Sequence, residues 1–245
     1  MKTVINNYTL YPAQERQIAA HSWGIASETF FGGDDEKTLG IGNLVQFTQT
    51  AFHPGYSNTG MRLLRNIELV DIVLQGRAGF QDSTGSVATY PQETIQVISA
   101  GKGIYLSEFN ATEQGVLEKL QIGFLPKKLN TNPIQTKALF DLDEHRNSLV
   151  TLISPHVDAS SLSIKQHAAV LLGKFDEGKQ IIYDVSGTST GLFLFVVQGI
   201  VTVSDKILNK SDGISVSPAE RIAVTFAKKS ILVLIEIAIE DQENK

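Results

Sequence analysis

The sequence contains no cysteine among its 245 residues. Disulfide bonds, thiolate catalysis and cysteine-ligated zinc are therefore excluded. Histidine is scarce as well, and no two histidines have the His-x-His or His-x-x-x-His spacing of paired metal ligands. The five are His21, His53, His145, His156 and His167. The sequence therefore offers no local pair of histidine metal ligands.

Excess positive charge and long apolar runs are also missing. Lysine and arginine number 21 against 26 acidic residues, so the net charge of −5 gives no reason to expect a nucleic-acid partner. The apolar segments GLFLFVVQGIVTV and SILVLIEIAIE are too short to span a bilayer, and Glu236 interrupts the second. The first twenty residues contain Glu15 and Arg16 and no apolar run, so we expect neither a signal peptide nor a membrane partner. These features predict a cytoplasmic protein.

Strand-like segments fill most of the chain. IELVDIVLQ, SLSIKQHAAVLLGKF, KQIIYDV, GLFLFVVQGIVTV and KSILVLIEIAIE are rich in β-branched and aromatic residues, and turn residues separate them. Helical periodicity is confined to residues 13–20, with a turn near 141–147. Short strands at this spacing predict an all-β protein built from sandwiches or barrels.

A weak internal repeat divides the chain. DIVLQGRAGFQD (71–82) and LFVVQGIVTVSD (194–205) share four residues in twelve at an offset of 123 residues. A chance match explains this equally well on its own, but an offset of half the chain also favours two similar barrels. LPKKLNTNPIQT (125–136), rich in Pro, Asn and Lys, is the expected connection. We predict an N-terminal barrel over 1–125, a connection over 126–136 and a C-terminal barrel over 137–245.

One apparent catalytic motif does not carry catalysis. GTSTG (187–191) fits the Gly-x-Ser-x-Gly pattern of a nucleophile elbow around Ser189. Such an elbow requires a following helix and a histidine later in the chain. Here a strand-like segment follows and His167 is the last histidine. The motif therefore predicts a hairpin turn.

The stretch SAGKGIYLSEFN (99–110) is the better candidate for a site. Strand alternation places Leu106 and Glu108 on one face, and it does the same for Arg62 and Leu64. If both pairs face inward, Arg62 and Glu108 form a buried ion pair, and otherwise they are two surface charges. Among the histidines, only His53, in a loop before Pro54 and Gly55, is a candidate for lining a pocket.

Residues 62–110 resemble the core of the pirin family, whose members are bicupins. The matching features are the strand and turn from Glu68 to Gly76, the run Gln81-Asp82-Ser83-x-Gly85, Pro91, Gln96, and Ser99-Ala100-Gly101-x-Gly103-Ile104-x-x-Ser107-Glu108. HSWGIASETFFGGD (21–34), SLSIKQHA and LFLFVVQGIVTV resemble further parts of the family more thinly. The resemblance implies an all-β bicupin with two cupin-type jelly-roll barrels in tandem, and it explains the repeat.

The resemblance also implies a metal site that this chain has not kept. The family holds iron or another divalent metal through a His-x-His pair, a third His and a Glu, and some members are quercetinase-like dioxygenases. Its ligand positions fall on Arg62, Leu64, Leu106 and Glu108, and Phe80 replaces a further family histidine. One carboxylate does not hold such a metal against water, and Arg62 repels a cation. We therefore predict no metal cofactor.

These observations lead to one main expectation and two alternatives. We expect a metal-free pirin-like bicupin that acts as a small-molecule-binding or regulatory protein and takes an anionic or aromatic ligand. The predicted ligand-binding residues are Arg62, Glu108, Gln96, His53 and Tyr105. The first alternative is a quercetin dioxygenase with a displaced metal site that recruits Glu68, His53 or His21. The second is a protein-interaction module without a ligand. The sequence leaves enzymatic activity undecided and disfavours conventional quercetinase chemistry.

Overall fold

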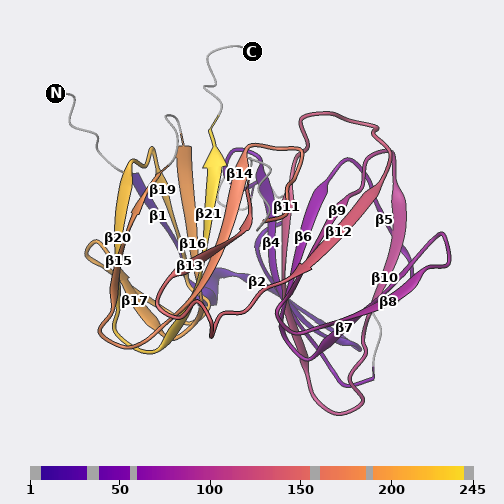
Figure 1. Cartoon of the computed structure of the whole chain (residues 1–245), viewed down its shortest axis with the longest axis horizontal. Helices are drawn as coiled ribbons and strands as arrows, with labels where there is room; N and C mark the ends of the chain where they lie inside the picture. Colours follow the sequence, from indigo (N-terminus) through magenta and orange to yellow (C-terminus); the bar gives the residue numbers. More distant parts are fainter. Residues whose placement is uncertain (1–6, 32–38, 56–59, 155–160, 186–189, 240–245) are drawn as a thin grey trace.

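The computed structural model describes residues 7–31, 39–55, 60–154, 161–185 and 190–239, and nearly all of its regular structure is strand. The strands form four antiparallel sheets, two in each half of the molecule (Figure 1). The N-terminal half contains a seven-stranded and a four-stranded sheet. In spatial order the larger sheet comprises β12 (Ile134–Leu139), β9 (Thr94–Ser99), β6 (Glu68–Gln75), β11 (Leu117–Phe124), β4 (Leu44–Phe52), β3 (Gly24–Phe30) and β2 (Gln17–His21), and the smaller comprises β5 (Arg62–Leu64), β10 (Ile104–Asn110), β7 (Arg77–Asp82) and β8 (Val87–Pro91).

The C-terminal half repeats this plan with a six-stranded and a four-stranded sheet. The larger sheet comprises β1 (Asn7–Tyr11), β19 (Gly213–Ser217), β16 (Thr190–Gln198), β21 (Ser230–Ala238), β14 (Ala168–Phe175) and β13 (Leu149–Ile153). The smaller comprises β15 (Gln180–Asp184), β20 (Arg221–Phe226), β17 (Ile200–Val203) and β18 (Lys206–Asn209). Each half is thus a jelly roll of two facing sheets, so the predicted tandem bicupin is confirmed.

The central strands of the two large sheets are buried on both faces. In β6, Val70 and Ile72 join a core that also contains Phe193 and Val233 of the other half. The alternate residue Leu69 faces the interior of the N-terminal jelly roll instead. Successive strand residues point to opposite faces, so a strand that is covered on both sides has an almost continuous apolar sequence. This double burial explains the run ELVDIVLQ and places the N-terminal interior between β6, β11 and β10.

The internal repeat corresponds to matching strand pairs. Residues 71–82 fall on β6 and β7, and residues 194–205 fall on β16 and β17. The shared glycines Gly76 and Gly199 connect each pair with left-handed φ values of 84° and 94°. Backbone of that kind favours glycine, which has no Cβ to clash. The repeat is therefore a repeated structural unit.

The strand pairing differs from the predicted division of the chain at two places. β1 pairs with β19, so it belongs to the C-terminal sheet, where Figure 1 shows it among the orange and yellow strands. β12 pairs with β9 and completes the N-terminal sheet, although the prediction split it between the connection and the C-terminal barrel. β12 is an edge strand with mostly exposed side chains. It therefore lacks the apolar pattern from which a strand is predicted.

Two local predictions had different outcomes. Residues 13–20 form only a 3-10 turn, Ala13–Glu15, before β2 begins at Gln17, so the predicted helical segment is wrong. Pairing of β2 with β3 outweighs the weak helical periodicity there.

The turn near 141–147 is present at residues 142–147. Ser189 lies outside the described residues, and the segment after it is a strand, as predicted.

None of the helical segments in the described part of the chain is long and apolar enough to cross a membrane.

Candidate functional site

The four positions onto which the family resemblance maps metal ligands meet at the N-terminal jelly roll. β5 and β10 are neighbours, with Leu106 opposite Arg62 and Ile104 opposite Leu64. Leu64 and Leu106 are buried in the interior cluster, and Glu108 is buried beside them. Nη2 of Arg62 lies 3.2 Å from Oε2 of Glu108, while the Arg62 side chain stays 39% exposed. The Arg62–Glu108 ion pair is therefore present, with its carboxylate inside and its guanidinium partly in solvent.

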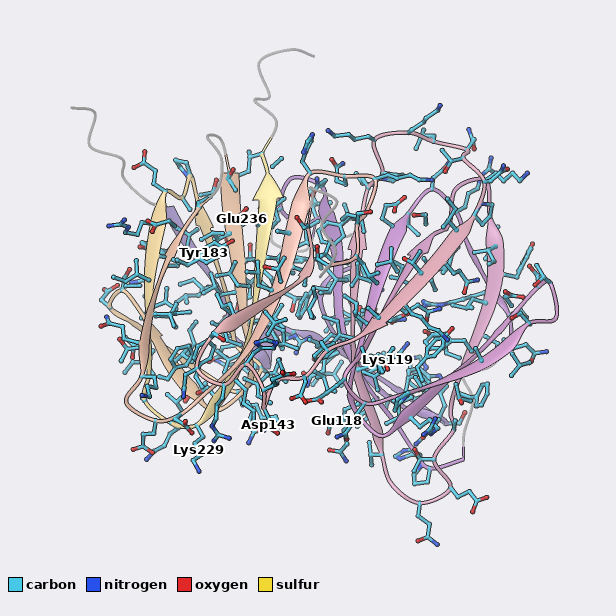
Figure 2. All side chains as sticks on the ribbon, in the orientation of Figure 1. Glu118, Lys119, Asp143, Tyr183, Lys229 and Glu236 are labelled. Atoms are coloured by element: carbon cyan, nitrogen blue, oxygen red, sulfur yellow. The ribbon has the colours of Figure 1, made fainter. Side chains whose placement is uncertain are left out.

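A second cation, Lys119, lies at the centre of this site. The sequence analysis did not single it out. Nζ of Lys119 on β11 forms ion pairs with Oε1 of Glu108 and, at 3.2 Å, with Oδ1 of Asp71. All three side chains are at most 3% exposed. Figure 2 shows Lys119 in the N-terminal half, opposite the half that contains Tyr183 and Glu236. The ammonium thus links the large sheet, through β6 and β11, to the small sheet, through β10.

Uncharged groups complete the surroundings of the ammonium. Gln121 is also on β11. Its Nε2 donates to Oε1 of Glu108 at 2.9 Å, and Oε1 of Gln121 accepts a hydrogen bond from Nη2 of Arg62 at 3.4 Å. The rings of Phe80 and Phe52 lie 5.2 and 5.7 Å from Nζ of Lys119. Their negative faces stabilise a cation at that range. Phe80, which replaces a family histidine, therefore contributes to a lysine site.

The two carboxyl groups that hold Lys119 shift in opposite directions. Burial favours the neutral acid in both. For Asp71 burial outweighs the attraction of Lys119, and its pKa is raised above the ordinary value. Burial acts on Glu108 as well, but Lys119 and Arg62 together outweigh it and lower the pKa of Glu108. The cluster therefore stabilises the ionised form of Glu108.

Gln96 lies in the same interior layer as Asp71, because the two residues are opposite each other on β9 and β6. Nε2 of Gln96 donates to Oε1 of Gln135 at 3.2 Å. Nε2 of Gln135 in turn donates to Oδ2 of Asp82 at 3.3 Å. Oε1 of Gln96 and Oδ2 of Asp71 have no hydrogen-bond partner among the described residues. Gln96 thus lies beside the charged cluster and connects it to the turn at Asp82.

Two predicted ligand-binding residues lie elsewhere. The Tyr105 side chain is 48% exposed, because it alternates with the buried Ile104 and Leu106 and so points to the outer face of the small sheet. The His53 side chain is exposed as well, and its backbone N–H donates to the carbonyl of Trp23. Neither side chain belongs to the buried interior around Glu108, and their predicted role in ligand binding stays a prediction.

The residues proposed for a displaced metal site are not brought together. Glu68 accepts hydrogen bonds from Ser99 and from the backbone of Lys165, on the face of β6 that is turned to the other half. His21 stacks on Trp23. Across the described residues no group of three or more His, Cys, Asp and Glu side chains could hold a metal ion. His156 lies outside the described residues.

The residues at the family's metal position do not fit a metal ion. Leu64 and Leu106 supply no donor atoms, and Glu108 already binds the cations Lys119 and Arg62. Divalent transition metals need several nitrogen, oxygen or sulfur donors. Two positive groups within hydrogen-bond distance of the one suitable carboxylate also oppose a third cation. A metal there would have to displace an ammonium that the fold has buried.

Two facing-sheet units, each with its own apolar interior, define the chain as a bicupin. Residues 17–123 match the family model described as Pirin, and residues 151–237 match the model described as Quercetinase C-terminal cupin domain. The chain belongs to the pirin family.

Individual relatives are distant but cover most of the chain. The chain is 24% identical to the quercetin 2,3-dioxygenase of Escherichia coli K12 over 230 residues, which are 93% of this chain and 97% of the relative. It is 29% identical to a pirin-like protein of Caulobacter vibrioides over 174 residues, covering 71% of this chain and 74% of the relative. The crystal structure of the bacterial pirin YhhW of Escherichia coli in complex with nickel(II) superimposes with a TM-score of 0.87 at 23% identity, over 96% of this chain and 100% of that one. This structural likeness shows a shared fold.

Proposed function

We propose that this protein is a metal-free member of the pirin family that binds a small anionic molecule, such as an aromatic carboxylate or phenolate, through Arg62. The observation that carries the proposal is the state of the Arg62 guanidinium. Its Nε is buried and has no hydrogen-bond partner among the described residues, whereas the side chain as a whole reaches solvent. An unpaired buried N–H costs about 1–3 kcal/mol, and a shift of this partly exposed side chain would bring Nε to a ligand oxygen that removes the cost. Arginine presents its donors in a planar fork that matches a carboxylate.

The apolar surroundings support an aromatic or other apolar body for this ligand. Leu64, Leu106 and Phe80 lie in the interior cluster behind Arg62 and Glu108. Small-molecule sites combine such apolar walls with a few polar groups that orient the ligand. Lys119 and Gln121 already satisfy Oε1 of Glu108, so Arg62 is the cation of the cluster that remains open to solvent.

Binding of benzoate to the full chain, measured by titration calorimetry, tests this proposal. We expect benzoate to bind and its neutral analogue benzamide to bind at least about tenfold more weakly, since only the anion pairs with the guanidinium. Arg62→Gln should abolish the preference for benzoate. Arg65→Gln is the matched control, because Arg65 is exposed and donates to Asn130 rather than to Glu108. Equal binding of the two probes, or an equal loss in both variants, would refute the role of Arg62.

The alternative function is metal-dependent oxygenation of a flavonol, which the names of several relatives suggest. Metal analysis of the purified chain, followed by quercetin-dependent oxygen uptake with added nickel, iron or manganese, separates it from our proposal. We expect neither stoichiometric metal nor oxygen uptake, because the metal position contains two leucines and two cations. Stoichiometric metal with oxygen uptake that Glu108→Gln removes would favour the dioxygenase. If neither this activity nor benzoate binding is found, the protein-interaction alternative is favoured.

A further inference from the structure

The ammonium of Lys119 occupies a point where two carboxylates from different strands converge. Asp71 comes from β6 and Glu108 from β10, and each binds Nζ of Lys119. These three side chains are almost completely buried. Glu108 is also the one residue retained from the family's metal-ligand positions. The chain therefore places a cation of its own against the carboxylate that the family uses to hold a metal.

The C-terminal half shows that the fold does not require these charges. The repeat offset of 123 residues relates Asp71 to Leu194. Lys119 lies opposite Val73, and Leu232 lies opposite Val196, the repeat counterpart of Val73. Glu108 lies opposite Phe80, and Val224 lies opposite Val203, the counterpart of Phe80. The three equivalent residues, Leu194, Val224 and Leu232, form part of a buried apolar core.

Stability alone is therefore a poor explanation for the charged cluster. Well-packed apolar side chains usually stabilise a protein as well as a buried ion pair does, because burying charges has a large desolvation cost. The C-terminal jelly roll has buried apolar side chains at the equivalent positions. What the cluster does show is one buried carboxylate, Glu108, held between the two cations Lys119 and Arg62.

We propose that Lys119 is an internal replacement for a metal ion, so that the N-terminal jelly roll carries its cation as part of the chain. The ammonium neutralises Glu108, joins the two sheets and closes the site to divalent metals. Removing it leaves the carboxylates of Glu108 and Asp71 and the amide of Gln121 around one point. Oxygen donors of this kind suit hard divalent cations such as Mn²⁺. This inference does not depend on whether Arg62 binds a ligand.

Lys119→Ala in the full chain, with Mn²⁺ as the probe, tests this inference. We expect the wild type to show no change in melting temperature with Mn²⁺. The variant should bind Mn²⁺ at least about tenfold more tightly than the wild type, by calorimetry and electron paramagnetic resonance, and its melting temperature should rise with the metal. Lys119→Ala with Glu108→Gln should lose this gain. Lys137→Ala, at an exposed lysine of β12, is the control and should behave as the wild type.

Three outcomes would overturn the inference. The first is stoichiometric metal in the wild type that Glu108→Gln removes. The second is a folded Lys119→Ala variant with no gain in Mn²⁺ affinity. If this variant unfolds without metal, refolding with and without Mn²⁺, followed by circular dichroism, decides the matter. Recovery of native β-structure only with Mn²⁺ supports the inference, and failure to recover in both conditions is the third contrary outcome.

Discussion

At the scale of single residues, Lys119 determines the chemical character of the site around Glu108. Leu64 and Leu106 alone would indicate a site that has become an ordinary apolar core. Instead Lys119 forms ion pairs with Glu108 and Asp71, and Arg62 pairs with Glu108 from the solvent side. A buried carboxylate of this kind is stable only while its cations are present. The site is therefore a charged cluster with a positive group at its centre.

The two carboxyl groups of this cluster should respond differently to neutralisation. The pKa of Glu108 is lowered, so Glu108→Gln removes a charge that Lys119 and Arg62 need, and we expect a loss of about 3 kcal/mol at pH 7. The pKa of Asp71 is raised, so Asp71→Asn removes a charge that burial disfavours, and we expect a loss below about 1 kcal/mol. Urea unfolding measures both. Equal losses would mean that both carboxylates serve Lys119 alike.

At the scale of elements, the turns that join the sheets set the geometry of each jelly roll. Gly76 links β6 to β7 and Gly199 links β16 to β17, both with left-handed φ. A Cβ on Gly76 would lie 2.8 Å from the carbonyl oxygen of Val116, and one on Gly199 would lie 2.4 Å from that of Lys229. These turns therefore require glycine for space as well as for conformation.

Substitution of either turn glycine should accordingly destabilise the protein. We expect Gly76→Ala and Gly199→Ala to cost about 1–3 kcal/mol each, because alanine brings strain at a left-handed φ and a clash with backbone. Gly178→Ala is the control, since it is also left-handed but has nothing within 4 Å of its Cβ. Thermal unfolding monitored by circular dichroism measures these losses. If Gly178→Ala costs as much as the other two, crowding contributes nothing.

The turn at residues 142–147 is held to the end of β14 by charge. Arg146 donates to Asp176 at 2.6 and 3.0 Å, and Asn147 donates to the same carboxylate at 3.0 Å. These bonds lower the pKa of Asp176 below its ordinary value. A lowered carboxyl pKa adds stability above the unfolded-state pKa, and that stability is lost as the pH falls through the folded-state pKa.

Asp176→Asn should therefore matter near neutral pH and not in acid. We expect the variant to be less stable than the wild type at pH 7, and the difference to shrink as the pH falls below about 4. Urea unfolding at a series of pH values gives the comparison. Glu144→Gln, in the same exposed turn, is the control for the exchange of a carboxylate for an amide there. A difference that stays constant with pH would show that the ionised carboxylate is not what stabilises the turn.

At the scale of the whole molecule, the two halves share one core, and the first strand of the chain belongs to the C-terminal sheet. The largest apolar cluster combines Phe30 and Phe47 of one half with Phe193 and Phe195 of the other. Arg16 is buried at the same boundary, where it donates to the carbonyl of Ser27 at 2.6 Å, and burial lowers its pKa to about 10. The halves are therefore expected to unfold together.

Removal of the first strand should destabilise both halves. Tyr11 of β1 packs its ring against Phe30 at 5.1 Å and against Phe193 at 5.7 Å, so it contacts both sides of the shared core. We expect deletion of residues 1–11 to lower the melting temperature by about 5 °C or more, in one transition, by differential scanning calorimetry. Tyr11→Phe keeps the ring and should change little. Two separate transitions would contradict a shared core.

Much of the fold could be predicted from the sequence, because alternating strands, turn glycines and a half-length repeat are local signals. The two-residue period of a strand predicted that Leu106 and Glu108 share a face, as do Arg62 and Leu64, and it left open whether those faces point inward. Tyr105 could have been excluded by the same period, since its neighbours Ile104 and Leu106 face inward. The cytoplasmic location, the ligand and the absence of a nucleic-acid partner stay predictions.

The sequence by itself therefore determined the all-β class and the family. Only the tertiary structure decided which side chains surround Glu108. Leu120 and Ile122 make one face of β11 apolar, and Lys119 lies on the opposite face. The sequence of β11 alone does not decide whether that second face is exposed to solvent or buried in the interior. Packing buries both faces, because the C-terminal half covers the face with Leu120 and Ile122 and the small N-terminal sheet covers the face with Lys119. Asp71, Glu108 and Lys119 meet because β6 and β11 of the large sheet and β10 of the small sheet line one interior.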